Sequence, residues 1–184
     1  MQTLVYDILG GLFIFIPALV ANPGAVITGG YGKLDRGKNF IDGRRILGDG
    51  KSVSGYFGGI AIGAVSGIIV IEMLNIFKFA ISSLSFITVI LVSTSLSWGS
   101  LTGDLLGSFI KRRLNMNSGA RGSLLDMWPF VLVAFMFLYL IEPKFFINVY
   151  GNFIDIVFIM VLVPLLHRGV NILAYKMHRK DVPW

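Results

Sequence analysis

Long apolar stretches separated by polar segments dominate this 184-residue chain. A helix needs about 20 apolar residues to cross the hydrocarbon core of a bilayer. The pattern therefore predicts an all-α integral membrane protein, a single membrane domain over residues 1–184 with five transmembrane helices. We expect these spans at about residues 3–21, 54–77, 82–110, 124–141 and 149–175.

The polar segments between the spans carry most of the positive charge. Fourteen of the sixteen Lys and Arg residues lie in residues 22–53, in residues 111–123 or near the C-terminus, and only Lys78 and Lys144 lie elsewhere. Lys and Arg collect on the cytoplasmic side of a membrane. We therefore expect cytoplasmic loops at 22–53 and 111–123, a cytoplasmic C-terminus, an external N-terminus and a multi-pass protein of the cell membrane.

Composition agrees with a membrane protein and narrows the chemistry. Charged residues make up 14% of the chain, against about 25% in a typical soluble domain. The net charge of +6 follows from the cytoplasmic cations, so we expect no nucleic-acid partner. The chain has no cysteine, which excludes disulfides. The segment Met1–Tyr6 has no cation, so we expect no cleaved signal peptide.

Glycine recurs at every fourth residue in the second span, at Gly55, Gly59, Gly63 and Gly67. A stripe of small residues lets two helices approach closely in a membrane. The stripe therefore predicts a helix contact, either within the chain or at the seam of a homodimer.

The third span ends with a carboxylate followed by cations. On a helix, Asp104, Ser108 and Lys111 lie within about 60° of one another. Ser97 and Ser100 fall on the same face, and Arg112 lies at its edge, so one face of this helix is polar. Ionisable groups inside spans usually face the bundle interior or a wet cavity. Asp104 is either a salt-bridge partner of Lys111 or Arg112, or part of a functional site.

Asp126 opens the fourth span on the same side of the membrane. A carboxylate there is favoured by the helix dipole, but it could also be a second metal ligand opposite Asp104. Mg²⁺ typically takes one or two carboxylates plus phosphate oxygens. Two carboxylates facing many cations suit a magnesium-bound triphosphate.

The first loop combines glycines with cations, among them Arg44, Arg45 and Lys51. Glycine-rich turns with exposed N–H groups bind phosphate well. The loop lacks the spacing of a Walker motif, and by itself it is equally compatible with a solvated positive loop. Elsewhere, Glu72 and Asp155 are interpreted as structural, and His167 could touch a lipid headgroup.

Two segments are specific when taken together, "DGRRILGDGKS" at 42–52 and "GDLLGSFIKRRLNMNSGARGSLLD" at 103–126. They resemble a known family, the archaeal CDP-archaeol synthases. The family is related to the bacterial CDP-diacylglycerol synthases, whose pattern falls here on Gly103-Asp104-Leu105, Ser108, Lys111-Arg112 and Asp126. Met127 stands where the family often has Gln, and Ser52 where it usually has Thr.

The resemblance implies a CTP-dependent phospholipid cytidylyltransferase. It would transfer CMP from CTP to 2,3-bis-(O-geranylgeranyl)-sn-glycerol 1-phosphate, an isoprenoid ether phospholipid, giving unsaturated CDP-archaeol and pyrophosphate. Asp104 and Asp126 would bind Mg²⁺ and, with Lys111 and Arg112, carry catalysis. The loop residues implied in nucleotide binding are Asp42, Gly43, Arg44, Arg45, Asp49, Lys51 and Ser52.

Two other functions stay open. A CDP-alcohol phosphotransferase would share Asp42-Gly43, but the rest of its motif is missing. A transporter for an anionic metabolite would place carboxylates at the membrane midplane and often shows an internal repeat, which the chain lacks. For the enzyme, we expect the loop to be mobile without nucleotide, and a lipid groove bordered partly by the glycine-striped span.

Overall fold

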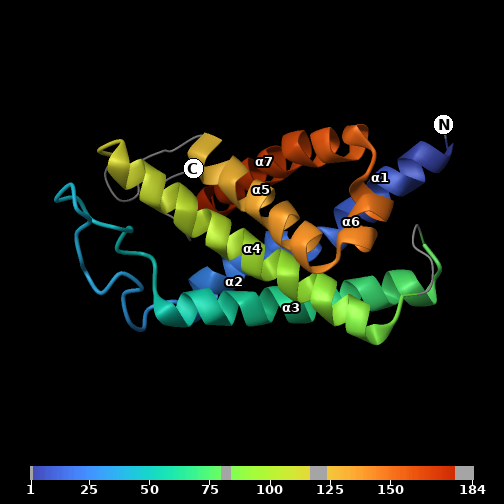
Figure 1. The fold of residues 1–184 in the computed structure, drawn as a ribbon, viewed down its shortest axis with the longest axis horizontal. Coiled ribbons are helices and arrows are strands. Elements are labelled where there is room, and N and C mark those ends of the chain that lie inside the picture. The colour runs from blue at the N-terminus through green and yellow to red at the C-terminus, as the bar shows by residue number, and fades with distance from the viewer. Residues whose placement is uncertain (1, 80–83, 117–123, 177–184) are drawn as a thin grey trace.

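The computed structural model describes residues 2–79, 84–116 and 124–176, without the side chains of 2–7, 124, 126, 167, 170, 171, 173 and 174. These residues form seven helices and two isolated β-bridges but no strand (Figure 1). The helices are α1 (Gln2–Ile14), α2 (Ile16–Thr28), α3 (Val53–Ile76), α4 (Phe86–Arg113), α5 (Leu124–Ile141), α6 (Pro143–Tyr150) and α7 (Phe153–Lys176).

The all-helical prediction is confirmed, but the number of spans is not. By length and composition, three segments could cross a membrane, namely Ile8–Thr28, α3 and α4. A fourth is possible if α6 and the first part of α7, bent by 84°, count as one span. In α5, the apolar part with described side chains, Met127–Ile141, is shorter than the other spans. The architecture is that of an integral membrane protein.

The first span continues beyond its predicted end at Ala21. Helix α2 passes through Asn22-Pro23-Gly24 and ends at Thr28. Proline removes one backbone hydrogen bond from a helix, but packing offsets this loss. The Asn22 Nδ2 donates to Ser100 Oγ at 3.2 Å, and a Cβ added at Gly24 would lie 3.4 Å from Gly59 Cα of α3. The Asn-Pro-Gly sequence, a local signal for the end of a helix, is therefore overridden by contacts with α3 and α4.

The glycine stripe of α3 is buried inside the bundle. A Cβ added at Gly59 would lie 2.6 Å from the Ala21 carbonyl oxygen and 2.8 Å from Leu101 Cδ1. One at Gly63 would lie 2.6 Å from Ser97 Oγ. The stripe thus packs on α2 and α4, as the intramolecular interpretation predicts. This face of α3 is occupied by α2 and α4, so a lipid groove bordered by α3 would use another face of the helix, and the groove stays a prediction.

Helix α4 is longer at its C-terminal end than predicted. It runs to Arg113, so Lys111 and Arg112 lie in its last turn and not in the loop 111–123. Cations are favoured there by the helix dipole. The serines of the predicted polar face are buried, and Ser100 Oγ donates to the Ala18 carbonyl of α2 at 2.7 Å. Ser97 Oγ donates to the Ser93 carbonyl of its own helix at 2.8 Å and also lies 3.4 Å from the Pro17 carbonyl of α2.

A second glycine stripe, which the sequence analysis missed, lies on α4 and packs against α5. It consists of Gly99, Gly103 and Gly107, again four residues apart. A Cβ added at Gly99 would lie 2.6 Å from Ala134 Cα, and one at Gly103 would lie 2.5 Å from Phe130 Cα. The stripe brings the start of α5 against the end of α4.

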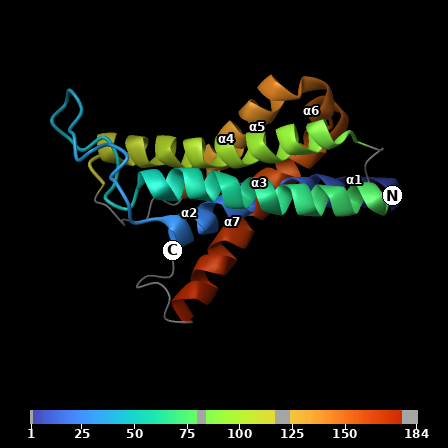
Figure 2. The ribbon, with the colours of Figure 1, turned by 90° about the horizontal axis from the view of Figure 1, so that it is seen from below.

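The last span differs from its predicted limits of 149–175. A short turn is expected at residues 142–148, between the last two spans, but residues 143–150 form α6, and α7 begins only at Phe153. Pro143 starts α6, and the Asn152 side chain accepts from the Ile154 N–H at 3.0 Å as α7 begins. Helix α7 then runs obliquely to α3 and α4 (Figure 2). Buried Tyr150 donates its hydroxyl to the Gly11 carbonyl at 2.8 Å and fixes the bend.

Candidate functional site

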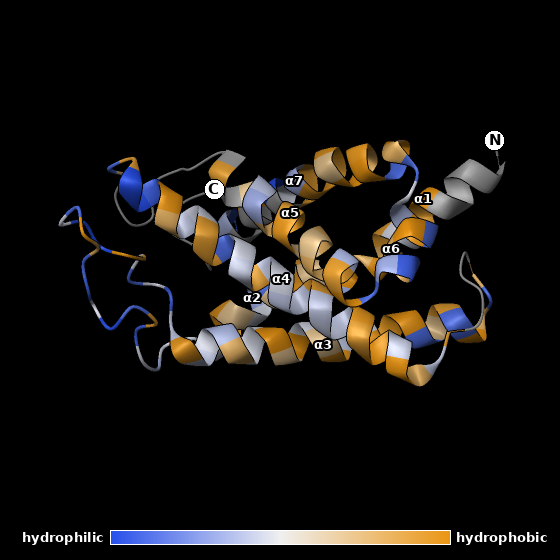
Figure 3. Cartoon of the chain, in the orientation of Figure 1, coloured by the Kyte–Doolittle hydropathy of each residue, from blue (hydrophilic) through white to orange (hydrophobic). Residues whose placement is uncertain are grey.

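The polar end of the bundle is built by the loop between α2 and α3 and by the last turns of α4. Figure 3 shows hydrophilic residues concentrated there, with apolar helices on the other side. The loop covers residues 29–52, shorter than the predicted 22–53 because α2 is longer. The predicted loop residues and the end of α4 are therefore neighbours in space.

A buried carboxylate holds the loop together. Asp35 accepts two hydrogen bonds from Arg45 Nη2 at 3.0 and 3.1 Å, and one each from the Gly37 and Leu47 N–H groups at 2.9 and 3.0 Å. Burial would raise the pKa of Asp35, but these N–H groups and the guanidinium outweigh it and lower the pKa below its ordinary value. The sequence analysis missed Asp35, for which the local signal is Asp-x-Gly at an Asx turn.

Asp49, predicted to bind nucleotide, contacts two loop cations. It accepts from Lys33 Nζ at 2.7 Å and from Arg45 Nη1 at 2.9 Å. These hydrogen bonds, that of Lys33 first, lower the pKa of Asp49 to about 2. Two of the six cations in residues 33–51, Lys33 and Arg45, are thus paired with the loop's own carboxylates. Mutual repulsion of these cations is the reason to expect a loop that is mobile without nucleotide; the ion pairs offset part of it, and the mobility stays a prediction.

Asp42 and Gly43 shape the tip of the loop. Gly43 has φ +75°, a conformation that favours glycine. Asp42 Oδ1 accepts from the Arg44 N–H at 3.1 Å and from Arg113 Nη1 at 2.5 Å. Arg44 in turn donates from Nη1 to the Arg113 carbonyl. Asp42 therefore ties the loop to the end of α4.

Ser52 and Lys51 connect the loop to α3 and α4. The Ser52 hydroxyl caps α3 by accepting from the Gly55 N–H at 3.1 Å, and it also accepts from Gly30 N–H at 3.2 Å. Lys51 forms an ion pair with Asp104, and both side chains are a little over a quarter exposed. Within the described part of the chain, the ionic partner of Asp104 is Lys51, not Lys111 or Arg112, the partners considered from helix spacing.

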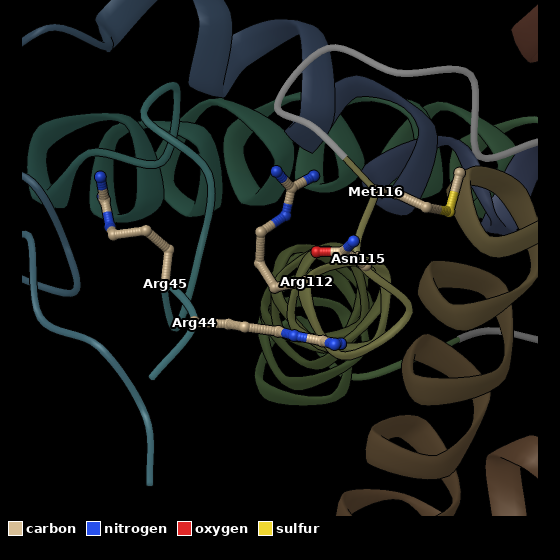
Figure 4. A pocket seen from close by; sticks show the side chains of 5 residues that line it. All are labelled: Arg44, Arg45, Arg112, Asn115 and Met116. Carbon is tan, nitrogen blue, oxygen red and sulfur yellow. The ribbon is translucent and has the colours of Figure 1, made fainter. Parts of the chain in front are cut away.

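A hollow of about 170 Å³ lies between the loop and the end of α4. It is lined by Arg44, Arg45, Arg112, Asn115 and Met116 (Figure 4). Arg45 from the loop and Arg112 from α4 extend in the same direction, while Arg44 crosses the end of α4. Three arginine side chains line one space, and guanidinium groups suit phosphate oxygens. Without ligand, the Arg45 guanidinium is bonded to Asp35 and Asp49, and that of Arg44 to the Arg113 carbonyl. Arg112 and Ser108 are both buried.

Asp126 lies in the first turn of α5, and its side chain is outside the described residues. The backbone places this turn against α4, because a Cβ added at Gly107 would contact the Leu125 carbonyl oxygen. Asp104 is one turn away on α4. Among the side chains that the structure describes, no group of three or more His, Asp or Glu residues could hold a metal. A metal here would need phosphate oxygens to complete its ligands.

Known proteins resemble this chain along nearly its whole length. A family model described as CarS-like, CDP-archaeol synthase, matches residues 3–184. The CDP-archaeol synthase of Picrophilus torridus is 56% identical over 179 residues, covering 96% of this chain and 97% of that protein. The one from Pyrococcus horikoshii is 41% identical, covering 97% and 98%.

The fold also matches a solved structure. An intramembrane enzyme for archaeal membrane lipids biosynthesis superposes with a TM-score of 0.70 at 32% identity. The match covers 90% of this chain and 94% of that one.

Proposed function

The chain belongs to the CDP-archaeol synthase family, and we propose that its reaction takes place between the arginine-lined hollow and Asp104. The function predicted from the resemblance is confirmed: the chain is a CTP-dependent cytidylyltransferase of archaeal membrane lipid synthesis. Its substrates are CTP and the isoprenoid ether phospholipid. The observation that carries the site assignment is that Arg44, Arg45 and Arg112 all line one hollow beside α4.

In this reaction an oxygen of the lipid phosphate attacks the α-phosphorus of CTP. A new O–P bond forms, the bond from the α-phosphorus to its bridging oxygen breaks, and pyrophosphate leaves. The attacking phosphate is already an anion, so no general base is required. The guanidinium groups would bind the β- and γ-phosphates, and their hydrogen bonds would strengthen as negative charge develops on the leaving pyrophosphate.

Lys51 and Lys111 complete the positive environment in this proposal. Lys51 neutralises Asp104 without substrate, and its ammonium group could turn to a phosphate once a metal takes its place on the carboxylate. Lys111 is a neighbouring cation in the last turn of α4. Ser108, one turn after Asp104 and buried, would support the helix at this level.

The carboxylates fit a divalent cation such as Mg²⁺. Asp104 is partly exposed, its partner is a flexible lysine, and Asp126 opens the helix that packs on the same part of α4. One or two carboxylates plus phosphate oxygens are the usual protein site for Mg²⁺. When bound, the ion would neutralise charge on the two phosphates. We therefore assign Asp104 and Asp126 as its ligands.

We further propose five membrane crossings with the loop end in the cytoplasm, in the cell membrane. The crossings would be α1–α2, α3, α4, α5 and α7, the last entered through the bend after α6. Two observations support these crossings. Positive charge collects at the loop end, and α5, whose described apolar part Met127–Ile141 is short for a transmembrane helix, packs along α4. A homodimer stays a prediction.

Purified protein with labelled CTP, Mg²⁺ and the geranylgeranyl glycerol phosphate tests the assignment. We expect release of pyrophosphate and a CDP-lipid in equal amounts, and neither product when the lipid is omitted. Arg112→Gln should lower the rate, whereas Lys144→Gln, which removes a cation far from the hollow, should not. Formation of CDP-lipid at the normal rate by Arg112→Gln would contradict the assignment of the hollow.

A further inference from the structure

Arg113 binds the loop between α2 and α3 through its guanidinium group. Its Nη1 donates to Asp42 Oδ1 at 2.5 Å, while its Nη2 donates to the carbonyl oxygens of Arg44, at 3.3 Å, and Arg45. The Arg44 side chain returns a hydrogen bond to the Arg113 carbonyl. Four hydrogen bonds thus join Arg113 of α4 to three residues of the loop tip, Asp42, Arg44 and Arg45.

Two aromatic rings contact the same guanidinium group. The guanidinium carbon lies 5.0 Å from the centre of the Phe40 ring and 4.9 Å from that of Phe109. The two rings meet edge to face, with centroids 5.3 Å apart. Since Phe40 belongs to the loop and Phe109 to α4, the cation joins two aromatic surfaces as well as two sets of polar atoms. This arrangement demands a planar guanidinium, which a lysine cannot supply.

The neighbouring arginine faces another way. Arg112 lines the hollow, whereas Arg113 does not. What Arg113 holds are the backbone carbonyls of Arg44 and Arg45, the two loop residues whose side chains line that hollow. Its position therefore determines where their guanidinium groups lie.

We propose that Arg113 is a positioning residue for CTP, which acts by holding Arg44 and Arg45 in place and does not touch the nucleotide. The proposal rests on the assignment of the hollow to CTP. It adds a third role to the basic triplet Lys111-Arg112-Arg113, in which the family pattern quoted above involves only the first two residues.

Equilibrium CTP binding to detergent-solubilised protein tests the proposal. We expect Arg113→Gln to weaken CTP binding by about tenfold, the effect of losing one or two charge-assisted contacts. Arg113→Lys keeps the charge but cannot bridge the carbonyls, so it should lie close to Arg113→Gln. Arg36→Gln removes the same charge from an exposed position of the same loop and should bind like the wild type.

Asp42 distinguishes positioning from direct contact. If Arg113 binds phosphate itself, Asp42→Asn releases a competing anion and should tighten CTP binding. If Arg113 positions the loop, Asp42→Asn should weaken CTP binding. The double variant Asp42→Asn/Arg113→Gln should then bind CTP no worse than Arg113→Gln alone, because both substitutions break the same contact between the loop and α4. Unfolding temperatures within a few degrees of the wild type would show that the bundle is intact.

The outcomes distinguish failure of the proposed CTP site from failure of the positioning role of Arg113. Wild-type protein that does not bind CTP would overturn the proposed site. Wild-type binding with unchanged affinity in Arg113→Gln, or tighter binding in Asp42→Asn, would overturn only the positioning role. In turnover assays, the KM for CTP should rise in Arg113→Gln while the KM for the lipid stays unchanged, a split that a general loss of folding would not produce.

Discussion

Polar side chains lie at two depths of this bundle, and their partners differ. In the middle, Ser100 of α4 donates to the Ala18 carbonyl of α2, and Ser97 donates to the Ser93 carbonyl within α4. At the loop end, Arg45 and Lys51 are bonded to carboxylate side chains and are between a quarter and a third exposed. A backbone carbonyl within a helix is fixed in place. A side-chain carboxylate can rotate away from its cation, so that a phosphate takes its position. The middle therefore joins helices, and the loop end is suited to binding anions.

The sharpest test of this contrast is to remove the charge of Asp104. We expect Asp104→Asn to reduce CDP-lipid formation by at least about a hundredfold, because the neutral amide would no longer hold a divalent cation. Asp126→Asn should have the same effect. Both proteins should still insert and unfold at about the wild-type temperature. If the pair with Lys51 were only structural, it would be worth roughly 0–1 kcal/mol, and most activity would remain in Asp104→Asn.

Removing a cation from the loop end should affect ligand binding before stability. We expect Lys51→Ala to weaken CTP binding by about 1.5–3 kcal/mol, the range for hydrogen bonds to charged groups. Arg45→Ala should weaken it similarly, and it should also loosen the loop because Arg45 holds Asp35 and Asp49. Titration calorimetry with CTP measures both, with exposed Lys38→Ala as the control. CTP affinity at the wild-type level in Lys51→Ala and Arg45→Ala would exclude the loop as the nucleotide site.

The middle of the bundle should respond in the opposite way. A methyl group at Gly59 meets Ala21 and Leu101 at under 3 Å, and overpacking of this kind costs about 1–3 kcal/mol. Gly59→Ala should therefore lower the unfolding temperature of the purified protein. Gly169→Ala, where the new methyl has open space, should be neutral or stabilising. A destabilised Gly59→Ala protein that still binds CTP normally would separate packing from binding, while unchanged stability would show that the α2–α3 contact is loose.

Hydropathy predicted the helical membrane class, but it predicted helix ends poorly. The Asn-Pro-Gly sequence at 22–24 is a strong local stop signal, yet α2 passes through it because Asn22 and Gly24 gain contacts with helices distant in sequence. The same limit applies to the bend before α7, which depends on Tyr150 reaching Gly11, a residue 139 positions away. Periodicity did identify the buried polar face of α4 and the glycine stripe of α3, because both are repeated over several turns.

The sequence indicated residues that the structure brings to the loop end, but not how these residues pair; their roles in the site stay a prediction. The sequence indicated Asp104 and the loop cations, and the structure brings them to one end of the molecule. It could not indicate that Asp104 pairs with Lys51, 53 positions away, nor that Arg112 and Arg113 face different ways. It also missed Asp35, because a carboxylate among loop cations resembles a solvated residue until its burial is known.

The smallest expected effect concerns pH, and it tests whether the loop has structure of its own. The pKa of Asp35 is lower in the folded loop than in the unfolded chain, where it is about 3.9. The folded loop therefore binds fewer protons, and the stabilisation by Asp35 is fully present above that unfolded value. It should be lost as the pH falls from about 4 through the lower pKa of the folded carboxyl.

Hydrogen exchange at the Leu47 amide, which donates to Asp35, measures this stabilisation. After correction for the intrinsic pH dependence of exchange, protection should decrease over that acidic window in the wild type. Asp35→Asn should show weaker protection at pH 7 and no further decrease on acidification, because an amide does not titrate. Amides in the middle of α4 should stay protected in both proteins, since their hydrogen bonds involve no ionisable group. Equal protection in wild type and Asp35→Asn at neutral pH would mean that the carboxylate does not hold the loop. The distinction between the two depths would then apply only to the residues that we propose to bind CTP.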